Sequence, residues 1–171
     1  LNINQINEIF QINKDKFKCF VANDNSNGQI VISGKVNSLE LLGYELKKKK
    51  IKFITLPVSA PFHSPLMNNA TNEMKEIINN TNLFDPIINI VSNVTGKPVN
   101  DSSEIKKLLI EQIEKPVRWR ESVINMIKFG TNKFIEVGPG KVLSGLIKRI
   151  DTNVKLKQVN NLSDINNLIN D

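Results

Sequence analysis

The one histidine of this chain, His63, is the residue best suited to acid–base chemistry, because imidazole titrates near neutral pH. It lies in residues 57–67 (PVSAPFHSPLM), after an apolar run and before a segment of helical character. Such a histidine can be a catalytic base, a metal ligand or a packed core residue. No second histidine exists and no cysteine lies near it in the sequence, so we expect no metal site. A lone histidine is more often structural, but a position at the end of a strand favours catalysis in α/β proteins.

A catalytic base needs a nucleophile, and the sequence around His63 offers no good one. Ser64 is adjacent, and consecutive side chains point apart on a helix or a strand. Ser59 lies further back, and neither serine stands in a strand–turn–helix elbow. Cys19 lies between phenylalanines in the middle of an expected strand, so we predict that it is core. Either His63 is structural, or its nucleophile lies upstream of Leu1.

The composition is that of an ordinary soluble domain, with 171 residues, 40% hydrophobic and 23% charged. The net charge of +6 suits an acidic protein partner as well as it suits a nucleic acid. No aromatic residues are interleaved with the lysines at 47–50, so we expect no nucleic-acid binding. The single cysteine excludes an internal disulfide, and no apolar run approaches the roughly 18 residues of a membrane span. Because the first residue is Leu1, we expect the chain to begin inside a longer protein.

The first third of the chain is predicted to have the order helix, strand, strand, helix, strand. The expected ranges are 2–12, 17–22, 29–34, 38–49 and 51–58. The Asn-rich segment 23–28 is the expected connection of the two strands, and Ser38 is the expected N-cap of the second helix. The order matches a ferredoxin-like β-α-β-β-α-β module without its first strand. We therefore expect a small α+β subdomain over residues 1–56.

The remainder, residues 57–171, is predicted to alternate strands and helices, which favours an α/β layer with parallel pairing. Leu66, Met67, Met74 and Ile77 are expected to face the core from the first of these helices. The expected helices are 64–80, 102–114, 119–129 and 162–170, the expected strands are 87–94 and 154–159, and residues 133–150 are expected to form a strand, a Gly-Pro-Gly turn and a helix.

Four segments together resemble the C-terminal half of the malonyl-CoA:acyl carrier protein transacylase family. They are ANDNSNGQIVISG (22–34), LPVSAPFHSPLM (56–67), EQIEKPVRW (111–119) and EVGPGKVLSGLIKR (136–149). The resemblance covers about residues 2–165 and implies an α/β acyltransferase fold, with a hydrolase-like parallel-sheet subdomain and a small ferredoxin-like subdomain. It implies transfer of a malonyl group from coenzyme A to acyl carrier protein, by a serine–histidine ping-pong mechanism in fatty acid biosynthesis.

The resemblance assigns roles to individual residues. His63 is the implied general base, and the backbone carbonyl of Gln112 is implied to orient its ring. Phe62 is implied to border the acyl α-carbon, with core packing as the alternative. Asn25 is implied to border the pocket, although Asn27 stands where the family usually has proline. The Gly-His-Ser-x-Gly elbow that carries the family's serine is absent from the sequence.

The resemblance also implies the partners, which are malonyl-CoA and acyl carrier protein. Coenzyme A is expected as a substrate, and no bound cofactor is expected. A monomer in the bacterial cytoplasm is expected, with a eukaryotic organelle as the alternative compartment. The rival functions are an acyltransferase module of a polyketide or multifunctional synthase and an inactive fragment that binds a carrier protein.

Overall fold

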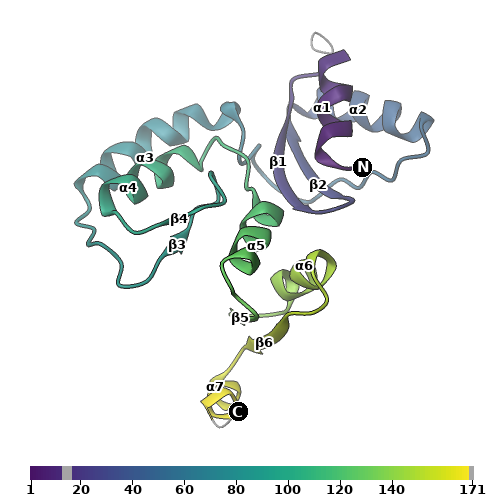
Figure 1. Cartoon of the computed structure of the whole chain (residues 1–171). Coiled ribbons are helices and arrows are strands. Elements are labelled where there is room, and N and C mark those ends of the chain that lie inside the picture. Colours follow the sequence, from purple (N-terminus) through teal and green to yellow (C-terminus); the bar gives the residue numbers. More distant parts are fainter. Residues whose placement is uncertain (13–16, 170–171) are drawn as a thin grey trace.

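The computed structural model describes residues 1–12 and 17–169, which contain both helices and strands (Figure 1). The first elements are α1 (Ile3–Ile12), β1 (Cys19–Ser26), β2 (Gln29–Gly34) and α2 (Val36–Lys48). Figure 1 shows both helices beside the β1–β2 hairpin. Their apolar sides meet around Phe17, Cys19, Leu42 and Leu46. The predicted order of these four elements is confirmed, and so is the burial of Cys19.

The hairpin closes through a two-residue turn, shorter than the connection predicted at 23–28. Ser26 pairs with Gln29, and Gly28 has a φ of +83°, which glycine adopts at little cost. Residues 23–26 instead continue β1, which is bulged there. The prediction was wrong because asparagines on a half-exposed, bulged strand produce the same pattern as asparagines in a loop.

Helix α2 begins earlier than predicted, and Ser38 is not its N-cap. Lys35 occupies the cap position and makes no side-chain capping bond. The Ser38 hydroxyl oxygen accepts a hydrogen bond from the backbone N–H of Lys18 at 3.2 Å. The tertiary contact with the start of β1 thus determines the role of this serine.

Residues 51–58 form no strand, contrary to the prediction. Ile54, Leu56 and Val58 are 65%, 50% and 64% exposed. In a β-α-β-β-α-β module the last strand pairs with the first, and no strand in the described residues takes that place. The segment has the alternation of a strand, but a strand forms only where a neighbour supplies the ladder hydrogen bonds.

The middle of the chain is built on two helices that lie along each other (Figure 1). Its elements are a 3₁₀ turn (Pro65–Met67), α3 (Asn68–Asn80), β3 (Ile90–Val91), β4 (Pro98–Val99) and α4 (Ser102–Glu111). The strand predicted at 87–94 shrinks to the two residues of β3, which pair antiparallel with β4.

The inward face predicted for the helix at 64–80 is wrong for three of its four residues, and only Met67 is partly buried. Leu66, Met74 and Ile77 are 37%, 41% and 59% exposed, and α3 has no buried residue. The apolar spacing is helical as predicted. Burial requires a second element against that face, and α4 covers only part of α3 in the described residues.

The last part of the chain contains α5 (Trp119–Lys128), β5 (Lys133–Val137), α6 (Val142–Ile150), β6 (Lys155–Val159) and α7 (Leu162–Ile169). Residue 170 of the predicted terminal helix lies outside the described residues. Strands β5 and β6 pair in parallel around the crossover helix α6, as predicted. Helix α5 contacts both β1 and α6 and so lies between the two ends of the chain (Figure 1).

Strand β5 presents one apolar face that the described residues leave uncovered. Phe134 and Glu136 are partly buried, whereas Ile135 and Val137 on the other face are 44% and 77% exposed. Parallel strands are normally covered on both faces. Strand β5 therefore exposes two apolar side chains that no other element covers in the described residues.

The boundary expected at residue 56 stays a prediction, but backbone hydrogen bonds cross it. The Val117 N–H donates to the Ala22 carbonyl at 2.8 Å, and the Asp24 N–H donates to the Val117 carbonyl at 3.0 Å. This bridge joins β1 to the segment between α4 and α5.

Candidate active site

His63 lies in a loop whose backbone is held by two serine hydroxyl groups. The fully buried Ser64 donates to the Pro61 carbonyl at 2.6 Å, and Ser33 of β2 donates to the Phe62 carbonyl at 2.6 Å. Between these contacts His63 has a φ of +57°. This left-handed conformation costs an L-residue ~1–2 kcal/mol and persists where the surroundings hold it, most often at functional sites.

The His63 ring reaches the carboxyl end of α4, where its Nδ1 lies 2.7 Å from the carbonyl oxygen of Gln112. A carbonyl oxygen can only accept, so Nδ1 carries a proton, and in the neutral ring Nε2 keeps its lone pair. Gln112 is the C-cap of α4, and the last carbonyls of a helix lack intrahelical partners. The structure thus brings the predicted His63 and Gln112 together, while their catalytic roles stay predictions.

No nearby nucleophile faces this ring in the described residues. The Ser64 hydroxyl is committed to the Pro61 carbonyl, and no described residue hydrogen-bonds to Nε2. Burial raises the pKa of the Cys19 thiol to about 11, so it is protonated at neutral pH and a poor nucleophile. The described residues also contain no cluster of three or more His, Cys, Asp or Glu side chains arranged for a metal ion.

Phe62 is not a core residue of the described chain. The residue is 47% exposed, and its backbone carbonyl accepts a hydrogen bond from the Ser33 hydroxyl. Packing in the core of the described chain therefore does not explain why a large apolar residue precedes His63. Its predicted place beside the acyl α-carbon stays a prediction.

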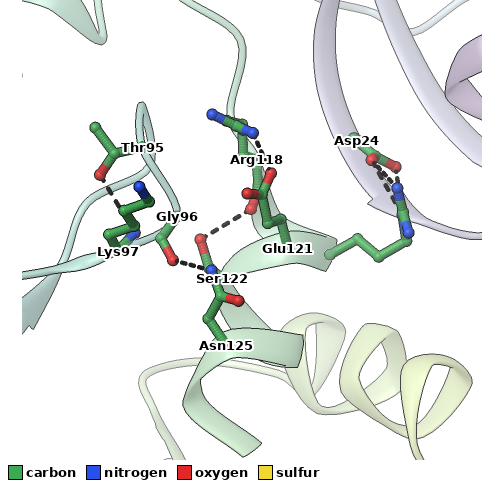
Figure 2. Close-up of polar contacts among 9 residues, drawn as sticks. Asp24, Thr95, Gly96, Lys97, Arg118, Glu121, Ser122 and Asn125 are labelled. Carbon is green, nitrogen blue, oxygen red and sulfur yellow. Dashed lines mark hydrogen bonds and ion pairs between the residues drawn. The ribbon is translucent and has the colours of Figure 1, made fainter. Parts of the chain in front are cut away.

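Asn25 lies on the bulged end of β1, and its side chain makes no hydrogen bond within the described part of the chain. The neighbouring Asp24 accepts from Arg120 of α5, with Nε at 3.0 Å and Nη2 at 2.8 Å from one carboxylate oxygen (Figure 2). The ion pair raises the Arg120 pKa, chiefly through these hydrogen bonds. The contact ties the end of β1 to α5, and the role of Asn25 at a pocket stays a prediction.

The first turns of α5 are anchored to the β3–β4 turn. Figure 2 shows Asn125 donating to the Gly96 carbonyl, at 2.8 Å, and the Ser122 hydroxyl donating to the Arg118 carbonyl, at 2.8 Å. Arg118 also pairs with Glu121. These contacts fix residue 118, which ends the loop that begins at Gln112.

Glu136, just before the Gly-Pro-Gly turn, caps α6 from outside the helix. Its carboxylate accepts from the N–H of Leu143 at 3.0 Å and of Ser144 at 2.7 Å. Partial burial by itself would raise the Glu136 pKa, but the hydrogen bonds from Ser144 and Leu143 outweigh it and hold the pKa below the ordinary 4.5. The amides at this helix start are therefore occupied by the chain's own carboxylate.

Two residues of the site were not predicted. Ser33 holds the peptide that precedes His63, and Asn93 donates through Nδ2 to Gln112 Oε1 at 3.2 Å. Both act on groups of other site residues, and neither lies at a spacing that marks catalytic chemistry. Only the structure reveals them.

No protein-family model matches the chain, but individual known proteins do. The chain is 43% identical over 136 residues to a malonyl CoA-acyl carrier protein transacylase of Bacillus subtilis, covering 79% of this chain and 43% of that protein. A Synechocystis transacylase of the same name is 36% identical over 154 residues, or 90% of this chain and 52% of that protein.

Solved structures match over nearly the whole chain. The acyl-carrier-protein S-malonyltransferase of Bartonella henselae superposes with a TM-score of 0.93 at 38% identity, over 99% of this chain and 55% of that one. A malonyl-transacylase in complex with a type II polyketide acyl-carrier protein gives a TM-score of 0.91 at 31% identity, over 100% and 56%. None of the helices in the described ranges has the length and apolar character to cross a membrane.

The α/β architecture shared with these structures identifies an acyltransferase fold. Within that class, the chain belongs to the malonyl CoA-acyl carrier protein transacylase family. It spans about half the length of the curated relatives it matches, with 43% and 52% of the first two.

Proposed function

We propose that this chain carries the histidine base of a malonyl-CoA:acyl carrier protein transacylase. The observation that carries the proposal is the contact of His63 Nδ1 with the Gln112 carbonyl, which leaves Nε2 ready to accept a proton. The names of the relatives support malonyl-CoA and acyl carrier protein as the partners. The proposed setting is fatty acid biosynthesis in the bacterial cytoplasm.

The proposed reaction has two half-reactions. In the first, Nε2 of His63 takes the proton of a serine hydroxyl while the serine oxygen bonds to the thioester carbon of malonyl-CoA. The carbon–sulfur bond then breaks, and the imidazolium returns the proton to the coenzyme A thiolate. In the second, Nε2 takes the proton of the phosphopantetheine thiol, the sulfur attacks the malonyl ester, and the serine oxygen leaves with that proton.

The proposed serine belongs to a polypeptide segment other than the described residues. Ser64 is buried and bonded to Pro61, so it does not meet the requirement for an exposed nucleophile within reach of the base. Each half-reaction consists of acyl transfer accompanied by proton transfer through His63. The proposal therefore needs no bound cofactor, and coenzyme A takes part as a substrate.

A second candidate differs only in the carrier that receives the malonyl group. The likeness to a malonyl-transacylase bound to a type II polyketide acyl-carrier protein extends over 100% of this chain. That observation favours a polyketide carrier as the alternative acceptor. Transfer rates to the two kinds of carrier protein, measured with one enzyme preparation, separate the candidates.

The test is a chimera in which this chain replaces the matching segment of the Bacillus subtilis relative. Malonyl transfer from coenzyme A to carrier protein is expected in the chimera and not in the 171-residue chain alone. His63→Ala should lower kcat/KM by ~10²–10⁴-fold, as for loss of a general base. Asn69→Ala, an exposed change in α3, is the control and should have no effect. A folded chimera with His63→Ala activity within a few-fold of the parent would contradict the proposal.

A further inference from the structure

We propose that Pro116 and Asn93 are positioning residues that reserve the Gln112 carbonyl for His63. The inference rests on the proposed role of His63 as the base. It starts from the way in which α4 ends. The Gln112 N–H donates to the Leu108 carbonyl at 2.9 Å, and the N–H groups of Ile113 and Glu114 donate three residues back, at 3.3 and 3.1 Å. The Lys115 N–H again donates four residues back, to the Glu111 carbonyl, at 2.9 Å.

The next donor in this helical series would be the N–H of residue 116, and its acceptor would be the Gln112 carbonyl. Residue 116 is proline, which has no N–H. Residue 116 therefore offers no N–H to the Gln112 carbonyl, and this is the carbonyl that His63 contacts at 2.7 Å. The four-residue spacing between Gln112 and Pro116 gives the site an acceptor without a competing backbone donor.

The chain that follows Pro116 turns away from α4. The Val117 N–H donates to the Ala22 carbonyl at 2.8 Å, and the Arg118 N–H donates to the Asn93 carbonyl at 2.9 Å. The backbone N–H groups on both sides of Pro116 are thus committed elsewhere. The Nδ1–H of the His63 imidazole is the donor that hydrogen-bonds to the Gln112 carbonyl.

Asn93 holds both ends of this loop. Its side-chain amide donates to Gln112 Oε1 at 3.2 Å, and its carbonyl accepts from Arg118. Asn93 itself sits in the β3–β4 turn, where the Gly96 N–H donates to the Ser92 carbonyl at 2.8 Å. A side chain on a braced turn thus restrains the residue whose carbonyl orients the base.

The experiment uses the presence of a single histidine, because ring ¹⁵N NMR of the labelled 171-residue chain then reports one tautomer without overlap. Spectra are recorded well above the ordinary imidazole pKa of about 6.5. The parent chain is expected to show a protonated Nδ1 and an unprotonated Nε2. Pro116→Ala introduces a competing N–H, and loss of one hydrogen bond's preference should shift the tautomer ratio by about 2- to 10-fold toward Nε2–H.

Matched variants separate positioning from general destabilisation. Pro98→Ala, at an exposed proline of β4, should keep the parent ratio. Asn93→Ala should shift the ratio in the same direction as Pro116→Ala, while Asn69→Ala should not. Asn93→Asp should restore the parent ratio, because the Gln112 amide can rotate and donate its NH₂ to the carboxylate.

The proposal is overturned if Pro116→Ala and Asn93→Ala both keep the parent tautomer ratio with unchanged circular dichroism. If Pro116→Ala does not fold, the Asn93 variants decide, and an unchanged ratio in Asn93→Ala overturns the proposal. The measurement needs no nucleophile and no turnover. The inference therefore stands or falls separately from the proposed function, which an inactive chimera would contradict. In an active chimera, Pro116→Ala should lower kcat and leave KM unchanged.

Discussion

Replacing His63 with glycine should leave the chain more stable than replacing it with alanine. Both changes remove the hydrogen bond to Gln112, so their difference isolates the backbone, which has a φ of +57° at this residue. The left-handed conformation costs an L-residue ~1–2 kcal/mol that glycine does not incur. The greater freedom of glycine in the unfolded chain offsets ~0.4–1 kcal/mol of this gain. The expected net advantage of glycine is ~0.5–1 kcal/mol in the free energy of unfolding.

Urea denaturation of the two variants, followed by far-ultraviolet circular dichroism, measures this difference. With a slope of ~1–3 kcal/mol per molar urea, the midpoints should differ by ~0.2–1 M in favour of glycine. The control is the same pair of substitutions at Glu76, an exposed position within α3. There glycine should be ~1 kcal/mol less stable than alanine. Opposite signs at the two positions are the expected signature.

Alanine at residue 63 that is as stable as glycine, or more stable, would refute the reasoning. It would mean that the loop does not hold a left-handed residue at this position in solution. The contacts of Ser33 and Ser64 would then not be maintaining a strained backbone, and the functional interpretation of that strain would fail with them.

Other changes test the acyl pocket, the cap of α6 and the uncovered face of β5. Phe62→Ser in the chimera should raise kcat/KM for methylmalonyl-CoA relative to malonyl-CoA by about 10-fold, and an unchanged ratio of these two kcat/KM values would show that the ring does not border the α-carbon. Because the residue is 47% exposed, the loss in the free energy of unfolding should be below the ~3–5 kcal/mol of a buried ring. Glu136→Gln should lower the free energy of unfolding near neutral pH by ~1 kcal/mol, measured in urea. Because the Glu136 pKa is lowered in the folded chain, the stabilisation by its carboxylate is complete above the ordinary pKa and is lost as the pH falls through the folded-state pKa. The free energies of unfolding of the parent and the variant should therefore converge in acid. A difference that stays constant with pH would contradict the capping role. Val137→Lys should abolish association of this chain with the remaining segment of the Bacillus subtilis relative, measured by calorimetry. The control is Val36→Lys on α2, where the parent residue is 70% exposed against 77% for Val137, and it should not affect association. Equal binding by both variants would show that the exposed face of β5 takes no part in the association.

The parts of the fold that depend on local chain properties could be predicted. The helices near residues 2–12 and 119–129 and the parallel strands around the Gly-Pro-Gly turn follow from apolar spacing and from Gly and Pro at their ends. Cys19 was predicted as core because it lies between phenylalanines in the middle of an expected strand, and it is 7% exposed. Errors arose where a neighbour decides the outcome. Asn-rich residues of β1 became strand by pairing with β2, and Ser38 became a partner of Lys18 instead of a cap.

The sequence by itself determined which chemical groups are present, because their identity does not depend on folding. These are one imidazole, one thiol, and the motif order that implied the Gln112 carbonyl as the acceptor for the imidazole. Only the tertiary structure decided that Nδ1 meets this carbonyl, 49 residues away, at 2.7 Å, and that Ser33 and Asn93 support the pair. The tertiary structure also decided that residues 51–58 form no strand and that Val137 is exposed. Pairing, burial and ring orientation are through-space properties, and local spacing along a chain does not specify which distant groups meet.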